Sequence, residues 1–167
     1  MSYVREIIQD LLNTKVEEKI AFKIHTFLVA SQENQHYGIP IESLVEVFEI
    51  TEENPLINIP LVENYIQGII NIRGEIIPVI SLNDILGLSS ERSKIKYVIV
   101  IERDFKLGLA FYEVKDLYQI TFDKIKPIYR IKENEGHRFF SNEFEVEDYI
   151  AQILNVEEFY ESAFVKG

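Results

Sequence analysis

From Phe22 onward, apolar and polar residues alternate over short distances, as they do in β-strands. Short runs rich in Val, Ile, Phe and Tyr are separated by turn residues, a pattern typical of an all-β protein. Ten strands are predicted, at residues 22–29, 36–41, 44–50, 65–72, 75–80, 96–102, 107–112, 115–121, 138–146 and 148–154.

The beginning of the chain has a different period. Apolar side chains recur at helical spacing at Val4, Ile7, Ile8, Leu11 and Leu12. With Ser2 as N-cap, this pattern predicts an amphipathic helical extension over residues 1–21, followed by a β domain over residues 22–167. The helix lacks the Lys/Arg-rich face of membrane-surface helices, so docking on its own domain is favoured over membrane binding. Contact with a partner stays an alternative.

Two residues predict details of the sheet. Gly74 can adopt a positive φ, which suits a tight turn between the strands at 65–72 and 75–80. Pro78 has no N–H to donate, so we expect the strand at 75–80 to lie at a sheet edge or to carry a bulge.

The sequence contains an internal echo. When residues 37–51 are laid over 107–121 without a gap, Gly38 falls on Gly108 and Glu46 on Asp116. Each segment is followed by a strand, a Leu-Asn pair and a short helical turn, at 80–86 and 151–159. Asn155 and Glu158 are spaced there as a capping box. Chance similarity between strands is the alternative, but a duplication predicts two five-stranded units, which hide their edges best as barrels. Exchange of strands between the barrels stays open.

Composition narrows the functional classes. The 167 residues include 17 basic and 28 acidic ones, a net charge of -11, so most of the surface should repel nucleic acid and anionic lipid. Cysteine is absent, which removes disulfides and thiol chemistry. The chain starts without signal-peptide features and has no apolar run of the ~20 residues that a membrane helix needs. We therefore expect a cytoplasmic protein without membrane insertion.

The search for catalytic or cofactor motifs finds none. The 3 histidines lack partners at metal-ligand spacing. The glycines form no phosphate-binding loop, and no nucleophile elbow is present. Acidic clusters resemble solvated loop charge. We expect no enzyme activity, no metal and no cofactor.

The most unusual segment is residues 68–82, where charged residues interrupt an apolar run. Asn71 and Arg73 occupy alternate positions and should share one strand face, with Ile70 and Ile72 on the other. Glu46 is the natural counter-charge for Arg73. Such a pair is either a structural ion pair, worth roughly 0 to 1 kcal/mol if exposed, or a recognition site. Glu75 is expected to be a solvated residue of the return strand.

Three longer segments carry a family resemblance: residues 37–50, 65–82 and 107–127. Together with the closing residues they resemble CheW, the coupling adaptor family of bacterial chemotaxis, from about Phe22 to Tyr160. The most specific part of the resemblance is the spacing of Gly68, Asn71, Arg73, Gly74 and Pro78.

The resemblance implies two SH3-like five-stranded β-barrels packed together, with a short C-terminal helix. It also implies a non-enzymatic adaptor that couples the cytoplasmic tip of a chemoreceptor to the regulatory domain of the histidine kinase CheA. Such an adaptor is recruited to membrane-associated receptor arrays, where weak self-association stays open. The residues carried over as partner-binding, by the receptor-facing groove between the barrels, are Glu46, Gly68, Asn71, Arg73 and Gly74.

The chain departs from the family pattern at a few positions. Ser81 stands where the family commonly has Asp, Phe111 and Tyr112 replace an Asp-containing element, and residues 141–143 replace a glycine-containing turn. We expect these polar positions near strand ends to affect the choice of partner rather than the fold. The alternatives are a CheW-like module of another kinase or motility system, resembling the CheA regulatory domain or CheV, and a β-barrel nucleic-acid binder.

Overall fold

The computed structural model describes residues 5–8, 23–129 and 138–161. Residues 5–8 are helical. The rest of the expected N-terminal helix lies outside the described residues, so its length and its boundary with the β domain stay predictions.

Strands dominate the described part of the chain. They are β1 (Ile24–Gln32), β2 (Gln35–Pro40), β3 (Leu44–Glu49), β4 (Ile66–Ile72), β5 (Glu75–Ile80), β6 (Tyr97–Glu102), β7 (Lys106–Phe111), β8 (Glu113–Thr121), β9 (Lys126–Pro127), β10 (Asn142–Val146) and β11 (Tyr149–Ile153). Short helical turns lie between the strands at η1 (Ile41–Ser43), α2 (Leu82–Ile85), η2 (Arg92–Lys94) and η3 (Phe122–Lys124), and α3 (Val156–Phe159) follows the last strand.

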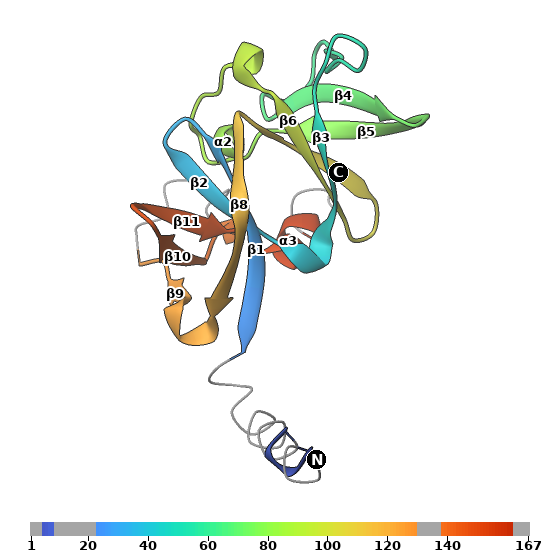
Figure 1. Cartoon of the computed structure of the whole chain (residues 1–167). Coiled ribbons are helices and arrows are strands. Elements are labelled where there is room, and N and C mark those ends of the chain that lie inside the picture. The colour runs from blue at the N-terminus through green and yellow to red at the C-terminus, as the bar shows by residue number, and fades with distance from the viewer. Residues whose placement is uncertain (1–4, 9–22, 130–137, 162–167) are drawn as a thin grey trace.

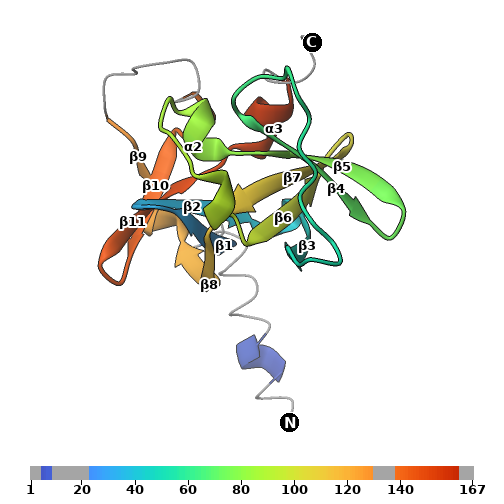
Figure 2. The same ribbon diagram turned by 90° about the horizontal axis from the view of Figure 1, so that it is seen from above.

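The strands form two curled sheets that pack against each other (Figures 1 and 2). One sheet has six strands in the order β8-β1-β2-β11-β10-β9, and the other has five in the order β3-β6-β7-β5-β4. The predicted all-β fold of two small barrels is confirmed. The six-stranded sheet includes one strand that was not predicted, β9. It is two residues long and has no apolar run that would reveal it in the sequence.

The two halves of the chain exchange strands. β1 and β2 belong to the six-stranded sheet, but the chain then crosses over, and β3, β4 and β5 belong to the five-stranded sheet. The second half does the reverse: β6 and β7 stay in the five-stranded sheet, and β8 returns to pair with β1. The halves also match in their parallel pairs, β5 with β7 and β11 with β2. This symmetric topology supports the duplication that the sequence echo suggested.

The expectation of β5 as an edge strand is wrong. β5 lies between β7 and β4, and β4 is the edge. The parallel pairing with β7 involves only Val79 and Ile80 of β5. Pro78 therefore falls just before the β7 pairing begins, where its missing N–H leaves no gap in that ladder.

A shared core joins the two sheets. Its largest apolar cluster takes buried side chains from both, including Tyr37 of β2, Ile99 of β6 and Phe111 of β7. Phe111 is fully buried, so this departure from the family pattern fills the core. The position lies at the end of β7 as expected, but the expectation that it is a polar position is wrong.

The other buried departure, Ser81, belongs to a polar network within this core. The side-chain amide of Gln32 in β1 donates to Ser81 Oγ at 3.0 Å, and Gln32 Oε1 accepts from the backbone N–H of Asn83 at 3.2 Å. Tyr37 Oη donates to Asn83 Oδ1 at 2.5 Å. The network connects β1 and β2 to α2, and it satisfies polar groups that would otherwise be costly to bury.

Candidate functional site

The candidate site is centred on the hairpin between β4 and β5. Ile72 and Glu75 pair across its base, leaving Arg73 and Gly74 as a two-residue turn with φ values of 52° and 86°. Positive φ at both turn residues is the signature of a type I′ hairpin, whose twist matches that of the strands. The Gly74 N–H donates to Asn71 Oδ1 at 2.8 Å. The predicted turn is confirmed, and Asn71 braces it.

Arg73 reaches from this turn to β3. Its Nη2 lies 2.5 Å from Oε1 of Glu46, and the two side chains are 72% and 26% exposed. β3 and β4 are opposite ends of the five-stranded sheet, so the ion pair links the curled sheet across its two edges. The predicted pairing of Glu46 with Arg73 is confirmed, and Ile70 and Ile72 are buried on the opposite face of β4 as expected.

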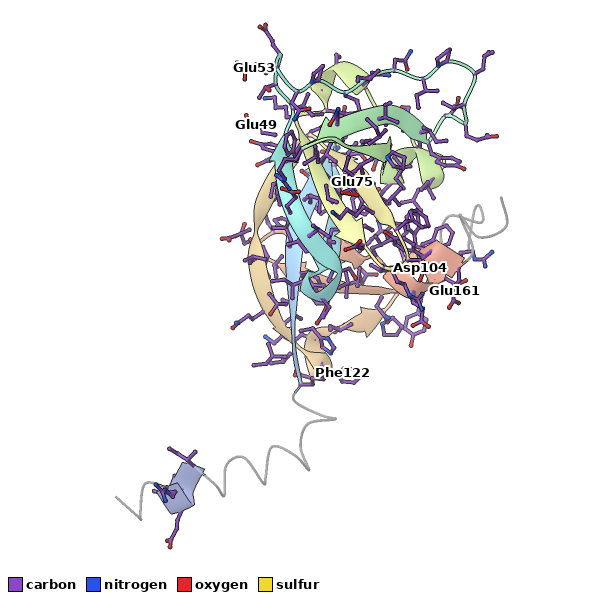
Figure 3. The ribbon with its side chains drawn as sticks, turned by 90° about the vertical axis from the view of Figure 1, so that its right-hand side faces the viewer. Glu49, Glu53, Glu75, Asp104, Phe122 and Glu161 are labelled. Carbon is purple, nitrogen blue, oxygen red and sulfur yellow. The ribbon has the colours of Figure 1, made fainter. Side chains whose placement is uncertain are left out.

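A second ion pair lies on the same hairpin. Lys106 Nζ of β7 is 2.9 Å from Glu75 Oε1, so Glu75 is a paired residue and not merely a solvated one. Figure 3 shows Glu75 on the face of the molecule that faces the viewer. The hydrogen bond and the charge of Glu75 raise the pKa of Lys106, with smaller contributions from Glu102 and Glu46. We call Glu46, Arg73, Glu75 and Lys106 the hairpin charge cluster.

Gly68 lies apart from this cluster. It is buried, with a φ of 143°, at a bulge where the register between β4 and β5 shifts. A Cβ at this position would lie 2.1 Å from the carbonyl oxygen of Ile57. The structure thus brings Glu46, Asn71, Arg73 and Gly74 together at the surface and puts Gly68 beneath the segment between β3 and β4.

The edge strands β3 and β8 carry exposed apolar side chains. In β3 two of them flank Glu46, as the sequence showed. Val45 and Val47 of β3 are 41% and 42% exposed, and Leu117 of β8 is 51% exposed. Val47 pairs with Ile99 and Leu117 with Leu28, both members of the shared core. β8 is the edge of the six-stranded sheet, next to β1, and β3 is an edge of the five-stranded sheet. For Val45 and Val47 the signal in the sequence is that β3, with the sequence LVEVFE, carries apolar residues on both faces.

The described residues offer little to other kinds of chemistry. Among them, no group of three His, Cys, Asp or Glu side chains could hold a metal ion. None of the helices within the described ranges is long and apolar enough to cross a membrane. An open hollow of about 720 Å³ is lined by residues of η3, β9 and β10, together with Glu147 and Ile150, and includes no member of the hairpin charge cluster.

Two small barrels that exchange strands, with polar and apolar groups displayed on edge strands, define a β-barrel interaction module. Comparison with known proteins gives the family. The profile of the CheW-like domain matches residues 24–164, and the chain belongs to this family. This supports the expectation that it is not an enzyme.

Individual relatives agree with this assignment. Chemotaxis protein CheW of Thermotoga maritima is 32% identical over 94 residues, which is 56% of this chain and 60% of the relative. A probable chemotaxis protein CheW of Rhizobium etli is 29% identical over 130 residues, 77% of each chain. A crystal structure described as the scaffolding protein TtCheW of Thermoanaerobacter tengcongensis superposes with a TM-score of 0.68 at 27% identity, covering 83% of this chain and 94% of the other.

Proposed function

We propose that this protein is a non-enzymatic adaptor of bacterial chemotaxis, which couples the cytoplasmic tip of a chemoreceptor to the regulatory domain of the histidine kinase CheA. The observation that carries the proposal is the placement of Arg73 and Glu46. Arg73 is held by the hairpin and Glu46 by the edge strand β3, in which the exposed Val45 and Val47 precede and follow Glu46. A membrane array would be its cellular location, reached through the receptor and not through a membrane helix of its own.

Receptor recognition follows from the chemistry of this surface. A receptor tip is helical, and helix-in-groove recognition needs apolar anchors with a few fixed polar groups that set the register. Val45, Val47 and Leu117 would supply the anchors. Arg73 uses one of its five N–H donors on Glu46 in the free protein, which leaves others for a receptor carboxylate or carbonyl. Gly74 allows the turn that presents Arg73.

The contact with the receptor need not be strong. An interface of about 1,000 Å² is at the small end for specific binding, but repetition in an array adds avidity. Charge separates this function from nucleic-acid binding, since a net charge of -11 repels phosphate backbones.

Co-precipitation tests the proposal directly. The full chain is tagged and incubated with a purified receptor-tip fragment and, separately, with a purified CheA regulatory domain. We expect the chain to retain each protein, and Arg73→Glu to reduce retention of the receptor fragment. If the folded wild-type chain binds neither protein, the adaptor function is wrong.

A further inference from the structure

The segment between β3 and β4 displays apolar side chains in solvent. Within residues 51–65, Ile57 is 45% exposed, Val62 is 39% exposed, and Leu61 is exposed to 103% of its reference area. Burial of a leucine side chain is favourable, but no neighbour among the described residues covers Leu61. The segment arches over the five-stranded sheet at the top of Figure 1, between β3 and β4.

The backbone at Leu61 is also unfavourable. Its φ is 61°, a left-handed conformation that costs a residue with a Cβ and is normally taken by Gly, Asn or Asp. Strained positions of this kind persist when the surrounding structure fixes them, and they concentrate at functional sites. A leucine that is both strained and exposed adds nothing to the stability of the free protein.

Several contacts hold the segment in place. Ile57 and Ile69 exchange two backbone hydrogen bonds, each 2.8 Å long. The Arg92 guanidinium donates to the carbonyl oxygen of Leu56 at 3.1 Å and to Asn58 Oδ1 at 2.5 Å. Gly68 allows this close approach, because a Cβ there would overlap the Ile57 carbonyl. On the other side of Leu61 and Val62, the Ile66 N–H donates to the Glu63 carbonyl oxygen at 3.0 Å. The segment is therefore anchored before and after these two residues, which lowers the entropy lost on binding.

Charge indicates what kind of surface would cover them. Residues 51–65 include Glu52, Glu53 and Glu63 and no Lys or Arg. Among the described residues, none of these three carboxylates forms an ion pair. Figure 3 shows Glu53 pointing away from the body of the molecule. Acidic side chains on the same segment as the exposed apolar ones favour a partner that carries basic groups.

We propose that Leu61 and Val62 form a knob that inserts into an apolar socket of a folded protein domain, and that Lys or Arg side chains border this socket. A second copy of this chain would bring like charge against like charge, and an anionic membrane would repel the same carboxylates. A single helix offers ridges and no socket. The knob is a docking surface separate from the hairpin charge cluster, and it gives Gly68 and Arg92 positioning roles.

The probe for this surface is the purified CheA regulatory domain, a folded domain, with the helical receptor-tip fragment as comparison; the choice of probe rests on the proposed function. Titration calorimetry with the full chain measures both affinities for wild type, Leu61→Ser and a control, Ile150→Ser, which removes an exposed apolar side chain (52% exposed) from the other sheet. We expect Leu61→Ser to weaken binding to the regulatory domain at least tenfold and to change receptor-tip affinity less than twofold. Ile150→Ser should behave as wild type.

Two further variants separate docking from folding. Leu61→Gly should raise the urea midpoint, because glycine accepts the positive φ, while it loses affinity as Leu61→Ser does. Glu52→Gln/Glu53→Gln/Glu63→Gln should reduce the salt dependence of regulatory-domain binding. Wild-type affinity of Leu61→Ser for the regulatory domain, or a loss confined to the receptor tip, would overturn the knob. A wild-type chain that binds neither protein would overturn the adaptor function together with it.

Discussion

Arg73 combines two roles that single substitutions can confuse. Its ion pair with Glu46 links the edges of the five-stranded sheet, yet the side chain is 72% exposed. Exposed pairs contribute about 0 to 1 kcal/mol to stability. This contribution is too small to explain why position 73 carries an arginine. The larger effect should appear in binding.

We predict that Arg73→Glu weakens receptor-tip binding about tenfold or more and lowers the free energy of unfolding by about 1 kcal/mol. The reversed pair, Glu46→Arg/Arg73→Glu, is the control, because it restores the attraction with the charges exchanged. Titration calorimetry and urea unfolding measure the two effects. Recovered binding in the reversed pair would mean that Arg73 acts only through the ion pair.

Gly74 and Gly68 belong to the same motif, but glycine is required at the two positions for different physical reasons. Gly74 has a φ of 86° and open space where a Cβ would be, whereas Gly68 combines a φ of 143° with a contact of 2.1 Å to backbone. We predict that Gly74→Ala costs about 1–2 kcal/mol, the usual left-handed penalty. Gly68→Ala should cost about 3 kcal/mol or more, since strain and overlap add. Equal urea midpoints for the two variants would contradict this assignment.

His36 gives the described fold a pH dependence. Its ring stacks on Tyr149 with centroids 4.1 Å apart. Burial, and then the charge of Lys115, lower the pKa of His36 below its usual 6.5. The unfolded chain therefore binds this proton more readily, so the contribution is present above pH 6.5 and is lost as pH falls through the folded-state pKa. The urea midpoint of the wild type should therefore fall between pH 7.5 and 5, and we expect it to fall less in His36→Gln. An equal fall in both proteins would contradict a lowered pKa of His36.

At the scale of elements, the sequence predicted strands well because their alternation is local. The turn at Arg73 and Gly74 and the cap at Asn155, which accepts from the Glu158 N–H at 3.1 Å, were read from neighbouring residues. The position of β5 within the sheet was not predicted correctly, because the order of strands depends on contacts between residues far apart in the chain. The roles of Ser81 and Leu61 were hidden for the same reason: burial and backbone strain depend on segments that pack over them.

The two short helices permit a matched comparison of caps. Ser81 caps α2 and Asn155 caps α3, but only Ser81 also bonds a buried partner, Gln32. Asn155→Ala should cost about 1 kcal/mol, as cap removal usually does. Ser81→Ala should cost about 2–3 kcal/mol, because the Gln32 amide is left unsatisfied in the core. Chemical denaturation measures both, and a smaller loss for Ser81→Ala would argue against the network.

At the scale of the whole molecule, strand exchange makes two barrels into one body. Each half of the chain supplies strands to both sheets, and the largest apolar cluster belongs to both. The edge strands β3 and β8 are therefore held in fixed relation, and the surfaces around Arg73 and Leu61 are displayed on a common rigid frame. Such a frame suits a protein that must hold two partners at once.

The most direct test of the adaptor account is whether one chain holds both proposed partners. Sedimentation velocity of the full chain with a receptor-tip fragment and a CheA regulatory domain, alone and together, distinguishes binary from ternary complexes. The account predicts a ternary complex with wild type, only the regulatory-domain complex with Arg73→Glu, and no complex of the two partners without the chain. Mutually exclusive binding of receptor tip and regulatory domain to the wild-type chain would contradict it.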